Sequence, residues 1–275
     1  MKWRAQHALL NFNLDNATHA RLEKTARVID SALAERAPVT KRRNTVARRE
    51  GLAPEAMDVL TEVIRIASSD NPWSPENRER NNLIMRWLRE TGLRRGELLN
   101  ITVEDILWRS NEVLIARRPD NPKDPRRNQP LVKTRDRLLP ISPDLARDTH
   151  AYVVGTRRQL PGGRKHGHLF VARSTGAPMS AAAMNLVFVQ LRKKCEALPN
   201  SFSPHLLRHT WNDAFSEHID RAGLSEEKEK QIRSVLMGWS ETSATAATYT
   251  KRHVRRKADQ VSRAMQQRML KGTRK

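Results

Sequence analysis

The stretch TGLRRGELLNITVEDI, residues 91 to 106, joins two predicted helices and anchors the interpretation of the whole chain. Gly92 is expected to end the first helix, because glycine readily takes the left-handed conformation that terminates helices. A further helical start follows near Glu97, and Arg94 and Arg95 lie at the junction. Considered alone, two arginines after a glycine-capped helix are most simply explained as solvated residues.

The chain before this junction is predicted to be helical. Apolar residues at helical spacing indicate one amphipathic helix, at Leu22, Ala26, Ile29 and Leu33. The basic stretch RAPVTKRRNTVARREG, residues 36 to 51, follows and is interpreted as a domain boundary. A second helix is expected to start near Pro54, since proline suits the first helical position, and to end before residue 71. The helix that reaches Gly92 has one apolar face, formed by Leu83, Ile84, Trp87 and Leu88.

The chain after the junction combines short strands with more helices. Strands are predicted at residues 112 to 116 and 137 to 141, separated by a connection too long for a tight turn, and residues 168 to 172 are expected to add a third strand. Further helices are expected over residues 180 to 197, 204 to 221, 225 to 237 and 253 to 270. The predicted class is mainly α with a small antiparallel β-sheet.

The composition indicates a polyanionic partner. Lys and Arg total 51 against 30 Asp and Glu in 275 residues, which gives a formal charge of +21 and a pI near 11.1. RNA-binding proteins share this charge, so it does not identify the chemistry. The single cysteine, Cys195, excludes a disulfide framework and a cysteine-based zinc site. No apolar stretch has the length of a membrane span or signal peptide, so a cytoplasmic protein without membrane contact is expected.

Two further segments contain a histidine, an arginine and a lysine that can act on a phosphate. The sequence SPHLLRHTW, residues 203 to 211, places His205 and Arg208 three positions apart on one helical face. Because nine histidines occur in the chain, this pair alone is weak support for a site. The sequence LVKTRDRLLPI, residues 131 to 141, places Lys133 in the approach to a strand, where most lysines are merely solvated.

A fourth segment, LMGWSETSATAATYTKRHV, contains one of the two tyrosines of the chain. Tyr249 lies among alanines and threonines before a basic run, which suits an exposed phenol near a phosphate. The other tyrosine, Tyr152, follows Leu145 at helical spacing and is better explained as a packing residue.

In this order, the four segments resemble the tyrosine site-specific recombinase or phage integrase family over residues 52 to 255. That family has an Arg in a Thr-Gly-Leu-Arg-x-x-Glu segment, a Lys in a β-hairpin, a His-x-x-Arg, a Gly-His or Gly-Trp, and then a Tyr. The matching residues are Arg94, Lys133, His205, Arg208, Trp239 and Tyr249. The resemblance implies a tyrosine recombinase catalytic domain with the fold of DNA breaking-rejoining enzymes.

The chemistry of a phosphodiester explains why these residue types are needed. Guanidinium groups offer paired donors to phosphate oxygens, so Arg94 and Arg208 are expected to clamp the scissile phosphate. Tyr249 is expected to attack phosphorus, with His205 helping to remove its proton. By resemblance, Lys133 is the general acid that protonates the leaving oxygen. Trp239 either donates its indole N–H to the phosphate or packs beneath the site.

The resemblance implies site-specific integration or excision of a mobile element through a 3′-phosphotyrosine. The phosphotyrosine conserves the bond energy, and the sequence has no phosphate-binding loop or acidic metal cluster, so no ATP, metal or other cofactor is expected. The expected partners are double-stranded DNA at a specific site, three more copies of the chain on synapsed DNA, and accessory DNA-bending proteins. Action in the bacterial nucleoid, by a phage-encoded or element-encoded enzyme, is expected. Further DNA contacts are predicted for Arg95, Arg135, Arg137, His209, Lys251 and Arg252.

The sequence departs from the family pattern in several places. Residues 1 to 50 are interpreted as a remnant of a longer DNA-clamping domain, residues 51 to 255 as the catalytic domain, and residues 256 to 275 as a basic tail. The hairpin connection is long, which leaves Lys123 as a competitor of Lys133.

The end of the chain differs in spacing and carries an apolar stripe. Trp239 and Tyr249 are ten residues apart, one more than is common in the family. An apolar stripe along the last predicted helix consists of Val254, Ala258, Val261, Met265 and Met269. This stripe is expected to dock on a neighbouring subunit or to pack within its own chain.

Two other functions are compatible with the same residues. A type IB topoisomerase uses a similar set to relax DNA without exchanging partners. A degenerate integrase would only bind DNA or RNA as an accessory protein, although the complete set of six residues argues against this. Covalent trapping on DNA and formation of junctions separate the three functions.

Overall fold

The computed structural model describes residues 15–36, 51–132 and 134–240, together with residues 258, 261–266 and 268. Lys133, Tyr249, Lys251 and Arg252 lie outside the described residues. The chain divides into two compact units, Met1–Arg48 and Arg49–Lys275, and the division falls within the basic stretch at residues 36 to 51.

The first unit contains helix α2 (Asn16–Arg36), in agreement with the amphipathic helix predicted there. Asp15 begins it, because its Oδ1 accepts the backbone N–H of Thr18 at 2.8 Å. Leu22 and Val28 are exposed.

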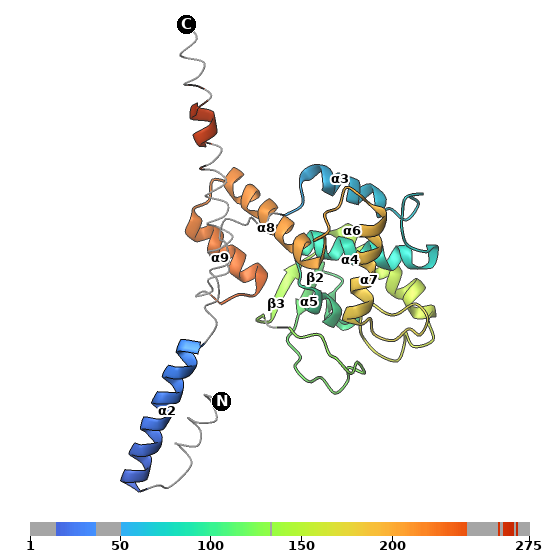
Figure 1. The fold of residues 1–275 in the computed structure, drawn as a ribbon. Helices are drawn as coiled ribbons and strands as arrows, with labels where there is room; N and C mark the ends of the chain where they lie inside the picture. Colours follow the sequence, from blue (N-terminus) through green and yellow to red (C-terminus); the bar gives the residue numbers. More distant parts are fainter. Residues whose placement is uncertain are drawn as a thin grey trace. The chain divides into compact units, whose positions relative to one another are not determined.

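The second unit is mainly helical, as predicted (Figure 1). Its helices are α3 (Pro54–Val63), α4 (Pro75–Thr91), α5 (Arg95–Asn100), α6 (Pro143–Tyr152), α7 (Ala181–Lys194), α8 (Pro204–Arg221) and α9 (Glu226–Met237), with short helical turns η1 (Val103–Asp105) and η2 (Val153–Arg157). Proline begins α3, α4, α6 and α8, where its missing N–H costs no helical hydrogen bond. In α6 and α8 the preceding serine also accepts a backbone N–H.

The sheet has three antiparallel strands in the order β1 (Ile106–Leu107), β2 (Glu112–Ile115) and β3 (Arg137–Pro140). In the register, Val113 pairs with Leu139 and Ile115 with Arg137. The prediction of a third strand at residues 168 to 172 is wrong, because this segment forms only the isolated bridges Thr102↔His168 and Val171↔Pro178. Its continuous apolar run is explained by burial of every residue from 168 to 171 rather than by a strand.

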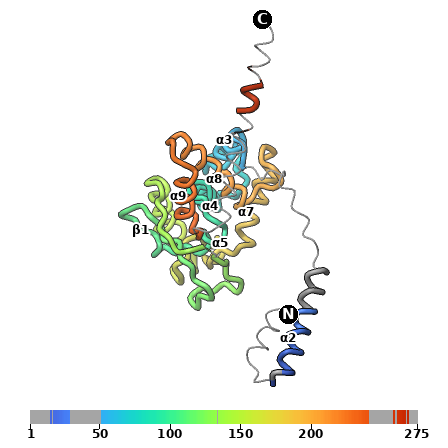
Figure 2. The backbone as a smooth tube through the Cα atoms, turned by 90° about the vertical axis from the view of Figure 1, so that its left-hand side faces the viewer, coloured from blue at the N-terminus to red at the C-terminus, as the bar shows by residue number. Residues whose placement is uncertain are grey.

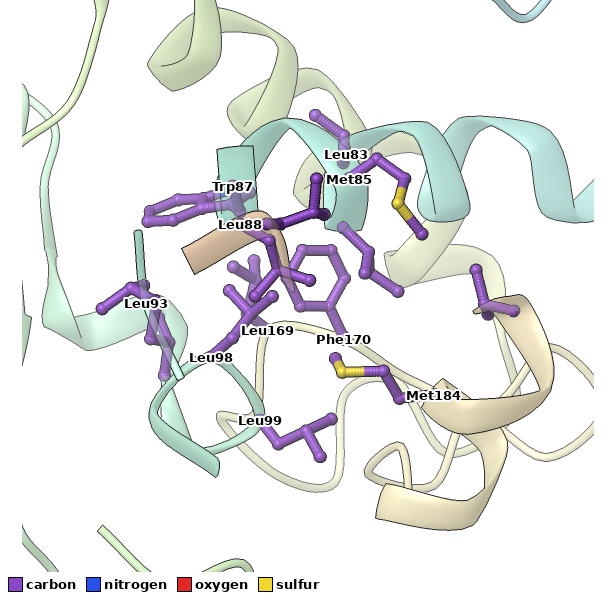
Figure 3. Packing of buried hydrophobic residues seen from close by; sticks show 14 of the residues in the cluster. Leu83, Met85, Trp87, Leu88, Leu93, Leu98, Leu99, Leu169, Phe170 and Met184 are labelled. Atoms are coloured by element: carbon purple, nitrogen blue, oxygen red, sulfur yellow. The ribbon is translucent and has the colours of Figure 1, made fainter. Parts of the chain in front are cut away.

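The core of the second unit surrounds α4, which contacts α5, α6 and α8. Figure 2 shows α4 in the middle of this unit, beside α5 and α8. The predicted apolar face of α4 is confirmed, since Leu83, Ile84, Trp87 and Leu88 are buried. Figure 3 shows Leu83, Trp87 and Leu88 of this face in one cluster with Leu98, Phe170 and Met184 from other segments. Within the described ranges, no helix is long and apolar enough to cross a membrane.

Gly92 ends α4 in the left-handed conformation, with φ of +64°, as the sequence predicts. A Cβ atom at this position would lie 2.8 Å from Cδ2 of Trp211 on α8. Glycine is therefore required both for the backbone turn and for the close approach of α8.

The change Gly92→Ala should therefore destabilise the protein more than left-handed strain alone does. That strain costs roughly 1–2 kcal/mol, and overpacking against Trp211 adds about 1–3 kcal/mol. The free energy of unfolding, from urea denaturation, measures the sum. Gly223→Ala is the matched control, because Gly223 has φ of +68° and a Cβ atom there would meet no other atom within 4 Å. Equal losses in the two variants would contradict the packing argument.

Candidate active site

The polar centre of the second unit is the buried carboxylate of Glu97, whose residue is 1% exposed. Glu97 lies at the third position of α5, where its Oε2 accepts the backbone N–H of Arg94 at 2.9 Å. Its Oε1 receives Arg94 Nη1 at 3.2 Å and the hydroxyl of Thr134 at 2.6 Å. The short helix therefore fixes both the carboxylate and the partly exposed guanidinium of Arg94.

Arg208 brings α8 to the same carboxylate. Its side chain is 2% exposed, and its Nη1 donates to the carbonyl of Gly92 at 2.6 Å and lies 3.9 Å from Glu97 Oε2. The left-handed turn at Gly92 presents this carbonyl toward α8. The two predicted clamp arginines, Arg94 and Arg208, therefore flank one acidic group although they are far apart in sequence.

Arg137 is a third arginine at this carboxylate. Its Nη2 lies 3.1 Å from Glu97 Oε2, its Nη1 donates to Thr134, and its Nε donates to the carbonyl of Leu236 at 2.7 Å. Burial lowers the pKa of Arg137, although Glu97 opposes this shift. The predicted direct contact of Arg137 with DNA does not fit this position, because its donors are directed into the protein.

The balance of charge at this cluster favours an anionic ligand. Three guanidinium groups share the single carboxylate of Glu97, which leaves a net positive charge. Burial would raise the pKa of Glu97, but the charges of Arg137 and Arg208, with its hydrogen bonds, outweigh burial and lower the pKa. Glu97 is therefore a carboxylate at neutral pH, and it orients the arginines without neutralising them.

We expect Glu97→Gln to lower the free energy of unfolding at neutral pH by roughly 3–5 kcal/mol, because it leaves the buried Arg137 without its countercharge. The pKa of Glu97 is lowered in the folded protein, so its contribution is present above the ordinary carboxyl pKa and is lost as pH falls through the folded value. Urea denaturation of both proteins from pH 7 down to about 3.5 measures this. If the difference in the free energy of unfolding between the two proteins stayed constant over that pH range, the lowered pKa of Glu97 would be contradicted.

Trp239 lies beside Arg208, just after α9. The Arg208 Cζ atom is 5.4 Å from the centroid of the indole ring, a cation–π geometry. Trp239 is buried with Met237 in a small cluster that Trp211 and Leu236 complete. This position fits the packing role, and α9 is thereby joined to the arginine cluster.

Gly238 lets the segment before β3 approach the end of α9. It ends α9 with φ of +64°, and its carbonyl accepts the backbone N–H of Arg135 at 3.0 Å. A Cβ on Gly238 would lie 2.7 Å from Arg137 Nη1. Strand β3 and helix α9, which are distant in the sequence, therefore meet at this site (Figure 1).

The two histidines of α8 are in contact but differ in exposure. The ring centroids of His205 and His209 are 4.3 Å apart in an edge-to-face arrangement. His205 is exposed, whereas His209 is buried. His205 is therefore accessible on the helix that carries Arg208, and the DNA contact expected of the buried His209 stays a prediction.

The remaining predicted DNA contacts fall into two groups. Arg95 and Arg135 are exposed, and Arg95 Nη1 donates to Oδ1 of Asn185 on α7 at 2.7 Å. Lys251 and Arg252 lie outside the described residues.

Lys133 is also outside the described residues, but both of its neighbours are placed. Val132 and Thr134 are buried, and Thr134 donates to Glu97. Lys123, its competitor, lies three residues before Arg126, whose guanidinium donates to the carbonyls of Leu99 and Met179. The residue that follows position 133 is thus bonded to the carboxylate of the arginine cluster.

A second buried network joins α8 to α9. Arg233 pairs with Glu229 and donates to the side chains of Asn212 and Ser216 at 2.8 and 2.6 Å. Asn212 in turn donates to the carbonyl of Arg208 at 2.8 Å. This network sets the position of α9 relative to Arg208.

Sequence reasoning missed Glu97, Thr134 and Arg233 as parts of the site. Glu97 carried a usable signal, because it is a charged residue next to Leu98 and Leu99 at the capping position after Arg94. Thr134 and Arg233 carry no such signal, since the contacts of Thr134 with Glu97 and of Arg233 with Asn212 and Ser216 join residues distant in sequence. Among the described residues, no group of three His, Cys, Asp or Glu side chains is arranged to hold a metal ion.

Comparisons with known proteins identify similar chains. The profile of the phage integrase family matches residues 57–256. The tyrosine recombinase XerD of Halalkalibacterium halodurans is 25% identical over 178 residues, which cover 62% of this chain and 51% of the relative. This chain therefore matches about half the length of that curated relative.

Several solved structures share the fold. The Tn1549 transposon integrase in complex with a circular intermediate DNA has a TM-score of 0.54 at 16% identity, over 94% of this chain and 85% of that chain. XerA recombinase gives 0.52 at 19% identity, over 94% and 80%. XerH recombinase, in a post-cleavage complex with palindromic difH substrate, gives 0.55 at 17% identity, over 78% and 53%. At these identities the likeness establishes the fold.

Proposed function

Because this chain belongs to the phage integrase family, we propose that it is a site-specific recombinase that cleaves and rejoins DNA through a 3′-phosphotyrosine. The observation that carries the proposal is the convergence of Arg94 and Arg208 on Glu97, within 3.2 and 3.9 Å of its oxygens. This arrangement concentrates positive charge where helices α4, α5 and α8 meet. A phosphodiester is the ligand that such a paired guanidinium site suits best.

The arginines act on the phosphate by stabilising charge. Arg94 is partly exposed and can turn a donor toward a phosphate oxygen, while Arg208 approaches from α8. Both groups stay protonated throughout the reaction, and Glu97 holds them before the substrate arrives. Such preorganised donors stabilise the transition state, because no reorganisation is needed as charge develops.

The cleavage step forms one bond and breaks one bond. The Tyr249 oxygen forms a bond to phosphorus, and the bond from phosphorus to the 5′ oxygen breaks. The proton of the phenol goes to His205 or water, and the 5′ oxygen takes a proton from the lysine ammonium. Attack by a 5′ hydroxyl of another strand reverses these transfers and reseals DNA, so that the sequence of steps consumes no ATP.

We assign the general acid to Lys133 rather than to Lys123. Thr134, the residue after Lys133, is bonded to Glu97 at 2.6 Å. Lys123 instead belongs to the part of the connection that is bonded to Leu99, Asn100 and Met179, at the C-terminal end of α5. The proximity of Thr134 to the arginine cluster supports the assignment.

The proposal is tested with a nicked DNA duplex that carries the end sequence of the mobile element. The short piece released by cleavage diffuses away, so the covalent complex accumulates. We expect an adduct that survives denaturation, that forms without ATP or added metal, and that protease digestion removes. Absence of the adduct on every nicked end sequence of the element would contradict the proposal.

Double-stranded DNA at a specific site is the proposed substrate, in the bacterial nucleoid or on phage or element DNA. The Tn1549 transposon integrase and XerH were both solved with DNA. The recombinase and integrase relatives favour recombination over simple relaxation. Exchange of strands between two differently labelled duplexes distinguishes the two activities, because a topoisomerase reseals only the original partners.

The proposed active assembly is a tetramer on two synapsed duplexes, aided by DNA-bending proteins. Two residues of the apolar stripe, Val261 and Met265, are 58% and 54% exposed. Their exposure supports docking of the last helix on a neighbouring subunit.

Deleting residues 256 to 275 should therefore reduce assembly of synapsed complexes while a single copy still binds one duplex. Native mass spectrometry of protein mixed with element-end DNA measures both species. A double substitution, Val261→Ser with Met265→Ser, tests the stripe without shortening the chain. Unchanged tetramer formation by both variants would contradict the docking proposal.

A further inference from the structure

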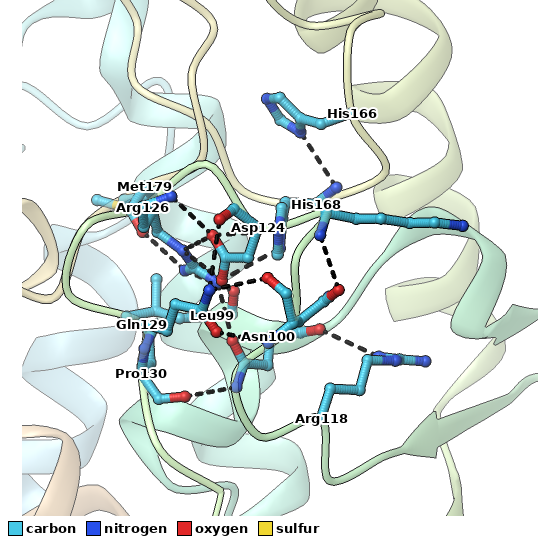
Figure 4. Close-up of polar contacts among 12 residues, drawn as sticks. Leu99, Asn100, Arg118, Asp124, Arg126, Gln129, Pro130, His166, His168 and Met179 are labelled. Carbon is cyan, nitrogen blue, oxygen red and sulfur yellow. Dashed lines mark hydrogen bonds and ion pairs between the residues drawn. The ribbon is translucent and has the colours of Figure 1, made fainter.

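The long connection between β2 and β3, residues 116–136, is fastened to the body of the unit through Arg126 (Figure 4). The Nη1 atom of Arg126 donates to the carbonyls of Leu99 and Met179 at 3.0 and 3.2 Å. Its Nη2 donates to Oδ1 of Asn100 at 2.8 Å. One side chain thus ties the connection to the end of α5 and to the segment before α7.

Asp124 completes this anchor from within the connection. It accepts Arg126 Nε at 2.8 Å and Nη2 at 2.7 Å, and the two side chains are only 2% and 6% exposed. Burial would raise the pKa of Asp124, but the hydrogen bonds and charge of Arg126 lower it. His168 lies 3.6 Å from Asp124, and burial followed by the charge of Arg126 lowers the pKa of His168 to about 4. At neutral pH the anchor is therefore an ion pair beside a neutral histidine.

A second set of contacts holds the connection where it returns toward β3. Asn100 Nδ2 donates to the carbonyl of Pro130 at 2.7 Å, so Asn100 binds the connection at both Arg126 and Pro130. A Cβ on Gly96 would lie 2.6 Å from the carbonyl of Leu131, which shows how closely α5 and the connection approach. Arg126, Pro130 and Leu131 are thus held along the helix that begins beside Arg94.

A purely stabilising role explains this anchor poorly. Burying a charged pair costs desolvation that the pair only partly recovers, and apolar residues of similar size often stabilise as well or better. Surface connections also tolerate mobility without loss of stability. The anchor instead restricts the course of the segment that leads directly to residue 133.

We propose that Arg126 and Asp124 are positioning residues that hold the proposed general acid, Lys133, at the leaving oxygen. The inference rests on the proposed function and concerns the same site. Arg126 binds the Asn100 side chain, which in turn holds Pro130, and the bond from Thr134 to Glu97 fixes the other side of position 133. Loss of the anchor should therefore weaken proton donation more than it weakens the action of Arg94 or Arg208.

A DNA substrate in which sulfur replaces the bridging 5′ oxygen separates proton donation from the rest of catalysis. On this substrate the tyrosine oxygen still forms its bond to phosphorus, and the bond from phosphorus to sulfur breaks. An ordinary thiol has a pKa of about 8.5, so the sulfur leaves as a thiolate without a proton from the protein. A variant that lacks only proton donation is therefore rescued on the sulfur substrate.

We expect Arg126→Gln to slow single-turnover cleavage of ordinary DNA by about 10- to 100-fold, the loss typical of a misplaced catalytic group. On the sulfur substrate, the cleavage rates of Arg126→Gln and of Lys133→Ala should both stay within about threefold of the rate of the unsubstituted protein. Both variants lose only proton donation, which this substrate does not need. The double variant Arg126→Gln with Asp124→Asn leaves no unpaired buried carboxylate. We expect it to show the same slow cleavage of ordinary DNA and the same rescue on the sulfur substrate as Arg126→Gln. Rates are measured at saturating protein and below the melting temperature of each variant.

Arg78→Gln is the matched control, because Arg78 also fastens a connection by donating to carbonyls, those of Ile66, Ser68 and Trp73. It should cleave both substrates at unchanged rates. Equal slowing of both substrates by the double variant, or no slowing of ordinary DNA, would overturn the inference while the proposed function stands. Failure of the unsubstituted protein to form an adduct on either substrate would instead remove the proposed function.

Discussion

Replacement of Tyr249 by phenylalanine should abolish the covalent adduct on nicked DNA while DNA binding persists. Phenylalanine keeps the ring but lacks the oxygen that must bond to phosphorus, so the phosphotyrosine intermediate cannot form. Binding depends on many phosphate contacts spread over a strongly basic chain, with a formal charge of +21, and one phenol contributes little to it. Denaturing gels measure the adduct, and gel retardation at fixed salt concentration measures binding.

Tyr152→Phe is the control, since Tyr152 is the other tyrosine of the chain. Tyr152 is buried in α6, and burial raises the pKa of its phenol to about 12, so it is a poor nucleophile and inaccessible to DNA. This variant should form the adduct at close to the original rate. An adduct that persists in Tyr249→Phe would show that another residue attacks the phosphate.

Arg208→Ala should lower the single-turnover cleavage rate by at least about 10²- to 10³-fold, the loss expected when one preorganised donor to a developing negative charge is removed. Arg208→Lys should recover only a small part of this loss, because an ammonium group cannot donate to two oxygens in the fixed geometry of a guanidinium. Affinity for DNA should change by no more than a few-fold, since phosphate contacts elsewhere remain. The two quantities are measured on the same nicked duplex at the same salt concentration.

The matched control for Arg208 is Arg221→Ala on the same helix. Arg221 has a largely exposed side chain and lies near Glu217, so its loss removes a positive charge without touching the arginine cluster. It should leave cleavage unchanged. A proportional loss of binding and cleavage in Arg208→Ala would indicate that Arg208 serves affinity rather than transition-state stabilisation.

Helices α4, α7, α8 and α9 of the second unit could be predicted closely because their local signals agree, whereas α6 (Pro143–Tyr152) is absent from the predicted helices. Proline at the first position and glycine after the last turn mark α4, and its apolar face is buried as its periodicity predicts. The segment at residues 168 to 172 shows where such signals fail. A short apolar run is compatible with a buried strand or with irregular chain in the core, and only tertiary packing distinguishes them.

The site could be predicted in outline, as a set of residue types in a particular order. The sequence pattern identified Arg94 and Arg208, and the structure places both beside Glu97. The burial of Arg137 and His209 could not be predicted, because a basic residue in a basic chain looks the same whether it faces solvent or a buried carboxylate. That difference depends on contacts between α5, β3 and α9, which are distant in the sequence.

The measurement that tests the central claim most directly is the identification of the residue that carries DNA. The denatured adduct is trimmed with nuclease and digested with trypsin, and the modified peptide is sequenced by mass spectrometry. The proposed mechanism predicts a 3′-linked nucleotide on Tyr249, in the peptide between Arg233 and Lys251. A nucleotide on any other residue, or linkage through a 5′ phosphate, would contradict it.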